Sequence, residues 1–302
     1  MPWIAPIRNL LRPARICACP EHRGGGDARQ TGGNIRPTAR DRSMAQALGM
    51  LDRAVHWLST LILSAALAAQ AEEPITLHYN ERAPYLQTLD NGDIVGLTAT
   101  PVTQALRRAG IAFKWEKTPS NRQIQILEKN TGVDCMVGWF KNPQRELIGN
   151  FSLPLYRDRP TIGLARFGNS RLDSGRSLEQ VLQDQQLRLL IKDGYSYGEL
   201  IDGLIQRFNP RRIITTAENS TMLRMLALDR VDYFFIAEEE ASELINRSKF
   251  EPGDFKLIRF SNSPAGNLRH LWCSKQVSRH RLEKINRALL ELSHANPSPR
   301  QP

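Results

Sequence analysis

Residues 134–146, DCMVGWFKNPQRE, combine side chains that suit the binding of a small anion. The apolar run CMV predicts a buried strand; Gly138, Trp139 and Phe140 follow it, and Arg145 stands seven residues past the glycine. A glycine at the carboxyl end of a strand lets a ligand approach backbone N–H groups, and an arginine offers a planar fork to a carboxylate. The two aromatics would form an apolar wall. A surface arginine beside aromatics that fill the interior fits the spacing equally well.

Three other segments could face the same ligand. Arg82 and Tyr85 lie in RAPYL, a loop after a predicted strand, where Tyr85 either stacks on a ligand or packs in the interior. Tyr195 and Ser196 lie in KDGYSYGEL, at a predicted helix start whose N–H groups favour an anion, unless Ser196 only caps the helix. Glu238 opens another predicted helix; the helix dipole accounts for an acid there, and the same acid could meet a ligand cation.

Residues 72–302 lack several common catalytic and nucleotide-binding motifs. There is no H-E-x-x-H, G-x-x-x-x-G-K-[ST] or G-x-G-x-x-G sequence. The histidines of this part are scattered and show no metal-ligand spacing. We therefore expect no catalytic residue, no metal and no cofactor.

The basic charge is concentrated near the N-terminus. The 302 residues carry a formal net charge of +10, but residues 1–71 hold nine Lys and Arg and four acidic residues, which leaves 32 basic and 27 acidic residues, a net charge of +5, for the rest. That rest has no basic run interleaved with aromatics, so no nucleic-acid partner is expected.

Residues 50–71, MLDRAVHWLSTLILSAALAAQA, have the three parts of a secretory signal peptide. A short charged start precedes an apolar run and a small-residue cleavage site before Glu72. The apolar run is shorter than the ~20 residues that a membrane span needs. We therefore expect a periplasmic protein. Residues 1–49 are rich in Arg, Gly and Pro without periodicity, so we expect them to be untranslated, with a start at Met44 or Met50, or disordered.

Two cysteines remain after the predicted signal peptide. Export would place Cys135 and Cys273 in an oxidising compartment, where a disulfide could form. Both stand inside apolar runs that predict buried strands, so two separately buried thiols fit at least as well. The sequence leaves both alternatives open.

Hydrophobic periodicity alternates between strand and helix along the chain. The expected strands are 75–79, 113–117, 133–138, 187–192, 212–216, 231–236, 255–260 and 268–274. The expected helices are 98–110, 120–132, 177–185, 197–207, 218–228, 238–247 and 279–293. This order predicts the α/β class with two lobes, each a mainly parallel sheet flanked by helices, and a ligand cleft between the lobes.

The expected domain boundaries follow from this pattern. Lobe 1 comprises residues 72–166 and 259–296, and lobe 2 comprises residues 167–258, so the chain crosses twice between them. Residues 297–302 are expected to be a disordered tail.

Four motifs in order resemble the periplasmic solute-binding proteins of the amino-acid ABC-transporter class, known as bacterial extracellular solute-binding protein family 3. They stand here as RAPYL, NGDIVGLTAT, VDCMVGWFKNPQRE and GNFSLPLY, and the resemblance covers about residues 72–294. It implies the type 2 periplasmic binding protein fold and a monomer. It also implies a small-molecule solute as ligand and an ABC permease or membrane sensor as partner.

The resemblance implies roles for individual residues. Arg145 matches the arginine that clasps a ligand's α-carboxylate, and Gly138 matches the glycine whose neighbours line that pocket. Tyr85 matches the aromatic after the proline. Tyr195 and Ser196 stand at the start of the second-lobe helix that helps to hold the carboxylate.

Three positions depart from the family pattern. Phe140 replaces a threonine that contacts the ligand, and Arg82 replaces an aromatic. Ala237 stands where an acid usually holds the α-amino group, with Glu238 one residue later. The expected ligand is therefore a small polar or carboxylate-bearing solute, amino-acid-like, rather than an assured α-amino acid.

Two other functions stay open at this level. Cyclohexadienyl dehydratase resembles the same family, and in such an enzyme Glu238 or Glu239 would act as the acid of an elimination. No matching acid and base pair is evident in the sequence, so we expect a protein that is not an enzyme. Alternatively, the chain is a receptor lobe without a small ligand, in which Trp139 and Phe140 fill the cleft.

Overall fold

The structure is a computed structural model that describes residues 72–295. The predicted signal peptide at 50–71, the segment 1–49 and the tail 297–302 lie outside the described residues. Within 72–295, none of the helices combines the length and the apolar character that crossing a membrane requires.

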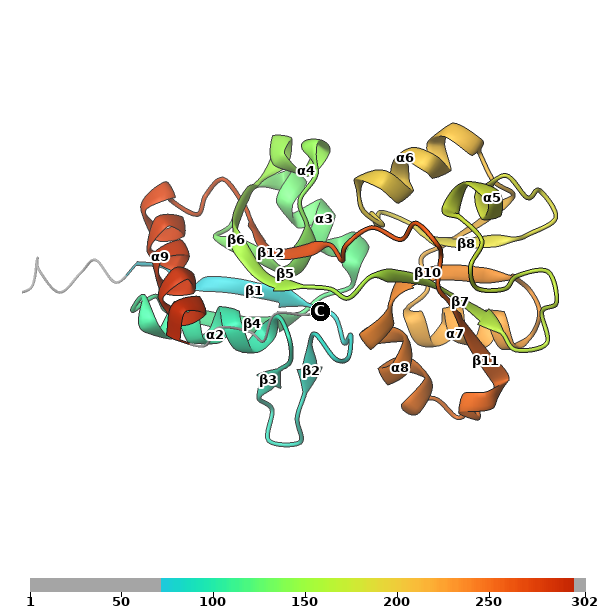
Figure 1. The fold of residues 1–302 in the computed structure, drawn as a ribbon. Helices are drawn as coiled ribbons and strands as arrows, with labels where there is room; N and C mark the ends of the chain where they lie inside the picture. Colours follow the sequence, from blue (N-terminus) through green and yellow to red (C-terminus); the bar gives the residue numbers. More distant parts are fainter. Residues whose placement is uncertain (1–71, 296–302) are drawn as a thin grey trace, which may run out of the picture. The chain divides into compact units, whose positions relative to one another are not determined.

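Lobe 1 is built on a five-stranded sheet with the strand order β4-β1-β5-β12-β6 (Figure 1). Its strands are β1 (Ile75–Tyr79), β4 (Phe113–Lys117), β5 (Asp134–Phe140), β6 (Asn150–Arg157) and β12 (Leu268–Cys273). β1 runs parallel to β4 and β5, whereas β12 runs antiparallel to β5 and β6. The other elements are α2 (Ala99–Arg108), α3 (Ser120–Lys129), α4 (Pro143–Ile148), α9 (Arg279–Ala295) and the hairpin of β2 (Gln87–Thr88) and β3 (Ile94–Val95).

Lobe 2 has its own five-stranded sheet with the order β11-β7-β10-β8-β9. Its strands are β7 (Thr161–Arg166), β8 (Leu189–Lys192), β9 (Arg212–Thr215), β10 (Tyr233–Ala237) and β11 (Phe255–Ile258). The helices are α5 (Leu178–Leu182), α6 (Glu199–Phe208), α7 (Asn219–Ala227), α8 (Glu238–Asn246) and the short 3-10 helix η1 (Pro252–Asp254). β8 is parallel to β9 and β10, and β7 is antiparallel to β10 and β11.

The predicted α/β class with two lobes is confirmed. The chain crosses between the sheets at residues 158–160 and 259–267. The first crossing lies earlier than the boundary expected at residue 166, because β7 already pairs with β10 and β11 in the second sheet. Residues 150–166 form two extended strands with only three residues between them, so the hydrophobic pattern gives no sign of the change of sheet.

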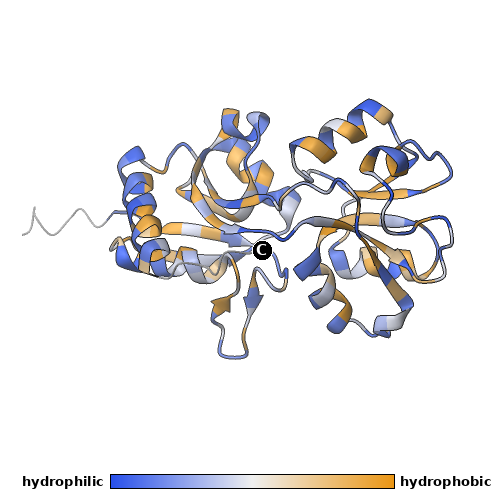
Figure 2. Ribbon diagram, in the orientation of Figure 1, coloured by the Kyte–Doolittle hydropathy of each residue, from blue (hydrophilic) through white to orange (hydrophobic). Residues whose placement is uncertain are grey.

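Each sheet is buried on both faces, as its continuous apolar strands require. In lobe 1, α2 and α9 cover one face, and α3 with α4 covers the other. In lobe 2, α5 and α6 cover one face and α7 and α8 the other. Figure 2 shows the matching pattern, with hydrophobic residues along the central strands and hydrophilic residues in the outer loops.

A β-bulge at Gly138 redirects the end of β5. Val137 and Trp139 face consecutive residues of β12, so Gly138 is the extra residue, with φ +83°. In a regular strand, residues 137 and 139 would point to the same face. Here Val137 packs on the side of α2 and α9, while Trp139 packs with Met136 on the side of α3. The expectation that the strand ends at Gly138 is therefore wrong: β5 continues to Phe140.

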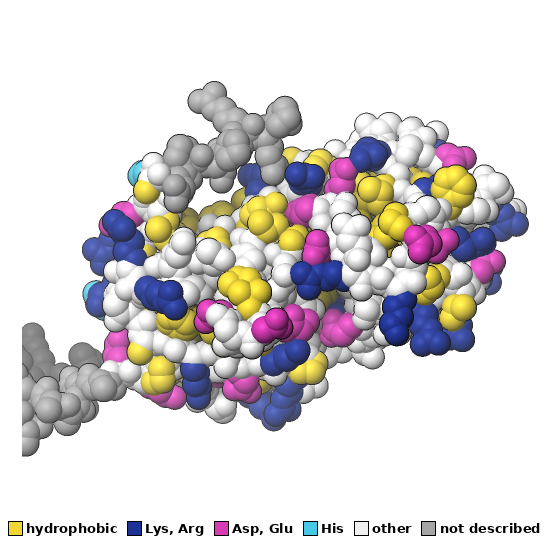
Figure 3. All heavy atoms as spheres, turned by 90° about the horizontal axis from the view of Figure 1, so that it is seen from below, with side chains coloured by type: hydrophobic (Ala, Val, Ile, Leu, Met, Phe, Trp, Pro, Cys, Tyr) yellow, Lys and Arg dark blue, Asp and Glu magenta, His cyan; other side chains and the backbone are white. Residues whose placement is uncertain are grey.

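Charged side chains of both signs are interspersed on the surface, as the face in Figure 3 illustrates. Many arginines of the described part pair with acids, such as Arg188 with Asp232 and Arg108 with Glu291. Neighbouring acids therefore compensate part of the positive charge.

A disulfide joins the two strands that lead to the bulge. Cys135 on β5 and Cys273 on β12 are paired neighbours in the sheet, and their sulfur atoms are bonded. Both residues are fully buried on the side of α2 and α9. The structure thereby decides between the alternatives that the sequence left open. Because the two cysteines are 138 residues apart, the bond ties the last strand of the chain into the first lobe.

Replacing both cysteines with alanine (Cys135→Ala/Cys273→Ala) should lower the free energy of unfolding by roughly 2 to 5 kcal/mol, because the unfolded chain regains the entropy of a long loop. Urea denaturation with and without a reductant measures the loss. The oxidised wild-type protein should respond to the reductant and the double variant should not. Equal midpoints for oxidised and reduced wild-type protein would contradict the prediction.

Candidate functional site

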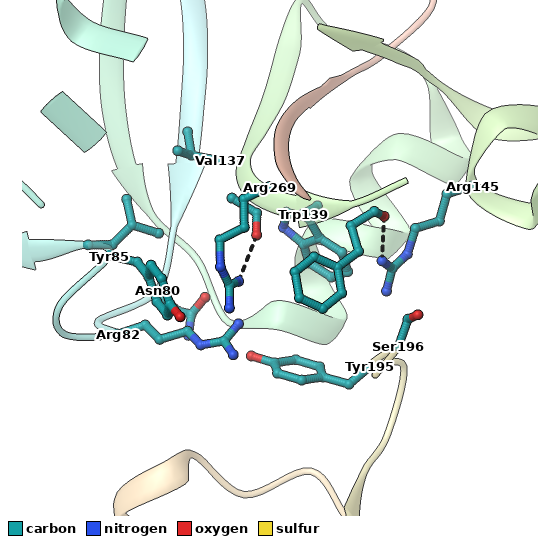
Figure 4. Close-up of a pocket in the computed structure, with 12 residues that line it drawn as sticks. Asn80, Arg82, Tyr85, Val137, Trp139, Arg145, Tyr195, Ser196 and Arg269 are labelled. Carbon is teal, nitrogen blue, oxygen red and sulfur yellow. Dashed lines mark hydrogen bonds between the residues drawn. The ribbon is translucent and has the colours of Figure 1, made fainter. Parts of the chain in front are cut away.

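A pocket lies between the two lobes and is lined by residues from both (Figure 4). Eight of the nine predicted ligand-binding residues line it, namely Arg82, Tyr85, Gly138, Trp139, Phe140, Arg145, Tyr195 and Ser196. The other lining residues are Asn80, Leu86, Val137 and Arg269. A second pocket shares Arg82, Phe140, Tyr195, Ser196 and Arg269 with the first and extends toward α7 and β10 of lobe 2.

The sheet topology explains why these residues meet. Arg82 follows the carboxyl end of β1, Phe140 ends β5, and Tyr195 follows the carboxyl end of β8. The carboxyl ends of parallel strands lie at one edge of a sheet, where α/β proteins place their ligand crevices. The antiparallel strand β12 begins at the same edge and contributes Arg269.

Arg145 is held by aromatic rings and backbone carbonyls. Its guanidinium lies 4.6 Å from the centre of the Trp139 ring, an arrangement that favours a cation. Nη1 donates to the carbonyl of Phe140 at 2.7 Å, and Nη2 donates across the cleft to the carbonyl of Gly194 at 3.0 Å. The α4 helix that carries Arg145 is capped by Asn142, whose side chain accepts a bond from the Arg145 N–H.

The charge of Arg145 has no carboxylate partner within 4 Å in the described part of the chain. Burial lowers the pKa of this guanidinium to about 10, although Asp202 and Tyr195 oppose the shift. The group is therefore positively charged at neutral pH and largely desolvated, with only 8% of Arg145 exposed. Such a group gains from an anion that reaches it.

Arg269 forms a buried ion pair at the crossing between the lobes. It donates to both oxygens of Asp158, at 2.6 and 2.7 Å, and to the carbonyl of Gly138 at 3.1 Å. Its guanidinium lies between the rings of Tyr85 and Phe140, at 3.7 and 4.8 Å from their centres. Burial raises the pKa of Asp158 to about 6 against the opposing effect of Arg269, so this carboxylate is charged at neutral pH.

Arg82 makes a second bidentate ion pair, and this one joins the two lobes. Its Nε and Nη2 donate to the two oxygens of Glu240 on α8, at 2.6 and 2.8 Å. Burial lowers the pKa of Arg82, but the Glu240 carboxylate raises it more, and the net shift is well upward. Asn219 also donates to Glu240, at 2.7 Å, so both carboxylate oxygens have partners.

Tyr195 lies among cations at the lobe 2 side of the pocket. The Arg82 guanidinium and the Lys192 ammonium lie 5.1 and 4.6 Å from the centre of its ring. Burial raises the pKa of the Tyr195 phenol, but the charges of Arg82 and Lys192 together with the hydrogen bond to Ser120 lower it, and the net shift is downward. The hydroxyl group lies 3.3 Å from that of Ser120 in lobe 1, which adds a polar contact between the lobes.

Glu238 is the one predicted ligand-binding residue that the structure does not bring to the pocket. Glu238 pairs with Arg259 outside both interlobe pockets. Its neighbours on α8 face the cleft instead: Glu239 accepts a bond from the Tyr85 hydroxyl at 3.0 Å, and Glu240 binds Arg82. Consecutive residues of a helix are rotated by about 100°, so these three glutamate side chains point in different directions. The sequence alone does not show which of them points toward the cleft.

Several site residues had no sequence signal. Arg269 and Asp158 are 111 residues apart and meet only because β12 returns to lobe 1. Lys192 was assigned to the end of a strand, and its 2% exposure and pairing with Glu218 depend on how α7 packs. Arg269, which was not predicted, lines the pocket together with the predicted residues Arg82, Phe140 and Tyr195.

The remaining space in the cleft is small. Each of the two pockets has a cavity volume of about 40 Å³, counted as space open to the centre of a water-sized group. One water requires ~10–15 Å³ on this measure, so each pocket has room for a few waters. A solute the size of an amino acid therefore requires the lobes to separate or side chains to move, as in hinged two-lobed proteins.

No protein-family model and no curated protein matched the sequence. Solved structures matched the fold. An ancestral arginine-binding protein bound to arginine superposes with a TM-score of 0.59 at 16% identity, covering 73% of this chain and 92% of that chain. Holo ArgBP from T. maritima gives a TM-score of 0.58 at 16% identity, covering 73% and 90%. AbpA from Streptococcus pneumoniae, an amino acid ABC transporter substrate-binding protein bound to L-arginine, gives 0.58 at 15% identity, covering 74% and 89%.

The two sheets, the double crossing and these superpositions define the class: the chain has the type 2 periplasmic binding protein fold. It is structurally akin to the substrate-binding proteins of amino-acid ABC transporters. At this level of identity the likeness establishes the fold, and the ligand has to be argued from the cleft of this chain.

Replacing Arg82 with methionine should lower the free energy of unfolding by ~3–5 kcal/mol, because Glu240, with 2% of its side chain exposed, loses its partner. The double variant Arg82→Met/Glu240→Leu should lose clearly less than the sum of the two single losses. Urea denaturation of the four proteins measures this coupling.

The exposed pair of Arg108 and Glu291 provides the control, since 55% of each side chain is accessible. Arg108→Met should change stability by about 1 kcal/mol or less. Additive losses at Arg82 and Glu240 would show that their ion pair is not a coupled unit.

Proposed function

We propose that this chain is an exported binding protein that captures a small polar or carboxylate-bearing solute, amino-acid-like, in the cleft between its lobes. The observation that carries the proposal is the guanidinium of Arg145, which lies in the cleft, is desolvated and is bonded to carbonyl groups rather than to a carboxylate. A bound carboxylate would accept the same two N–H groups in a bidentate arrangement. Ser196, on the opposite lobe, lines the same pocket and supplies a hydroxyl group nearby.

The lobes would open to admit the solute and close again around it. Arg145 reaches the carbonyl of Gly194, and Tyr195 reaches Ser120, so both lobes already contribute polar contacts at the pocket. A ligand that replaces the contact between Arg145 and Gly194 would bind to both lobes at once. Trp139 and Tyr85 would supply its apolar walls. This arrangement supports capture and release by hinge motion, for an ABC permease or a membrane sensor.

Export is part of the proposal. The predicted signal peptide at residues 50–71 and the disulfide between Cys135 and Cys273 both support a periplasmic location, because disulfides persist in oxidising compartments. The similar structures are binding proteins, two of them bound to arginine and one assigned to an ABC transporter. They support a small-molecule ligand and a role in binding rather than catalysis.

The variant Arg145→Ala should weaken the binding of the best ligand by about 100-fold, since a charge-assisted bidentate contact is worth roughly 2–3 kcal/mol. Calorimetry with a panel of carboxylic acids and amino acids identifies that ligand and measures the change. A ligand that binds the variant as tightly as wild type would refute Arg145 as the anchor.

A matched control is Arg281→Ala. Arg281 is also buried in lobe 1, with 5% exposure, but it lies on α9 outside the pocket. It should leave the affinity unchanged, whatever its effect on stability. Arg145→Lys, which keeps the charge and loses the fork, should lie between wild type and Arg145→Ala.

A further inference from the structure

The acidic groups around the cleft are all engaged by the protein itself. Glu240 receives Arg82 and Asn219, and Asp158 receives Arg269 on both oxygens. The other acids near the pocket are Glu239, which accepts from Tyr85 and from the N–H of Arg159, Glu218, which pairs with Lys192, and Asp202, which accepts from Ser196 and the N–H of Tyr197. A ligand ammonium group would therefore have to share a carboxylate that already has a partner.

One of these acids lies in a site built for a cation, and Arg82 occupies it. The Arg82 guanidinium is bonded to Glu240 and lies 5.1 and 5.5 Å from the ring centres of Tyr195 and Tyr85. An anionic partner with aromatic rings beside the cation is the usual setting for a bound guanidinium or ammonium. Below, "cation site" means Glu240, Asn219, Tyr85 and Tyr195. Because Arg82 is tethered to the same chain, its effective concentration at the cation site is high, and a free solute cation competes poorly.

The lining of the pocket favours an anion rather than a cation. Arg82, Arg145 and Arg269 contribute to its surface, and neither Asp nor Glu is among its lining residues in the described part of the chain. Figure 4 shows the guanidinium groups of all three directed toward the pocket between Trp139 and Tyr195. Two of the three are neutralised by Glu240 and Asp158, and Arg145 alone is not. The pocket therefore has one positive charge to offer and no acceptor for a second cation.

We propose that the ligand is a small organic carboxylate without an α-ammonium group, because Arg82 fills the place where the cleft would hold a cation. This rests on the proposed function, since it assumes that the carboxylate binds Arg145. The solute's carbon skeleton lies against Trp139 and Phe140, and the space beside Arg82 takes an uncharged end.

The first experiment compares acids that share a skeleton and differ in the ammonium group. Calorimetry at neutral pH is run with 3-phenylpropanoate against L-phenylalanine, 4-methylpentanoate against L-leucine, and 3-methylbutanoate against L-valine. In each pair with measurable binding, the member without the ammonium should bind at least 10-fold tighter.

The outcomes separate the two proposals. If an amino acid binds as tightly as its partner or tighter, and Arg145→Ala abolishes that binding, the ammonium-free ligand is refuted while the anchor stands. If no member of any pair binds, the proposed function is refuted together with this inference. Tighter binding of the partner without ammonium supports both.

The second experiment tests the cation site directly by chemical rescue. In Arg82→Ala the site should accept methylguanidinium, which carries the group that was removed. Millimolar methylguanidinium chloride should raise the melting temperature of Arg82→Ala by several degrees above the change seen with tetramethylammonium chloride. Wild-type protein, whose site is filled, should show no such difference between the salts.

The double variant Arg82→Ala/Glu240→Ala is the matched control, and it should lose the rescue because the anionic partner is gone. Should Arg82→Ala fold poorly, Arg82→Gln fills more of the space and is tested in the same way. Absence of rescue in both single variants, or equal stabilisation of wild-type protein, would overturn the assignment of the cation site to Arg82.

Discussion

The pairing of β12 with β5 is the contact on which the rest of the structure depends. β12 comes from the end of the chain and inserts between β5 and β6, so the sheet of lobe 1 includes a strand that follows all of lobe 2 in the sequence. The disulfide between Cys135 and Cys273 locks this pairing. The same pairing includes the bulge at Gly138 and places Arg269 in the cleft, so the site depends on the sheet of lobe 1.

The cleft is governed by how positive charges are compensated. Burial of several arginines is tolerated because Asp158 and Glu240 meet two of them with bidentate bonds, and aromatic rings cover their faces. Arg145 is compensated only by carbonyl dipoles and the Trp139 ring. This difference distinguishes the residue that can bind an incoming anion from those that hold the lobes together. It also explains why a charge count of the sequence says little about the ligand.

Much of the fold could be predicted because its signals are local. The alternation of strand and helix, the strand at 75–79 and the helix at 279–293 follow from hydrophobic periodicity over a few residues. The crossing at 158–160 could not be predicted from the sequence, because β6 and β7 are both extended strands. They pair in different sheets, with partners that lie far away in the sequence. In the site, Arg145 and Tyr195 were found by their positions after strands. The pairing of Arg269 with Asp158 was not predicted, because these two residues are 111 positions apart in the sequence.

The sequence by itself determined the α/β class, the two lobes and the edge of the sheets where polar and aromatic residues gather. These features follow from strand ends and helix starts, which neighbouring residues specify. Only the tertiary structure decided that the two cysteines are bonded, that Glu240 rather than Glu238 meets the cleft, and that Arg82 occupies the cation site. The physical reason is the same in each case. Where a side chain points, and which opposite charge compensates it, depend on partners within about 3 Å. These partners are distant in the sequence, so the order of residues does not identify them.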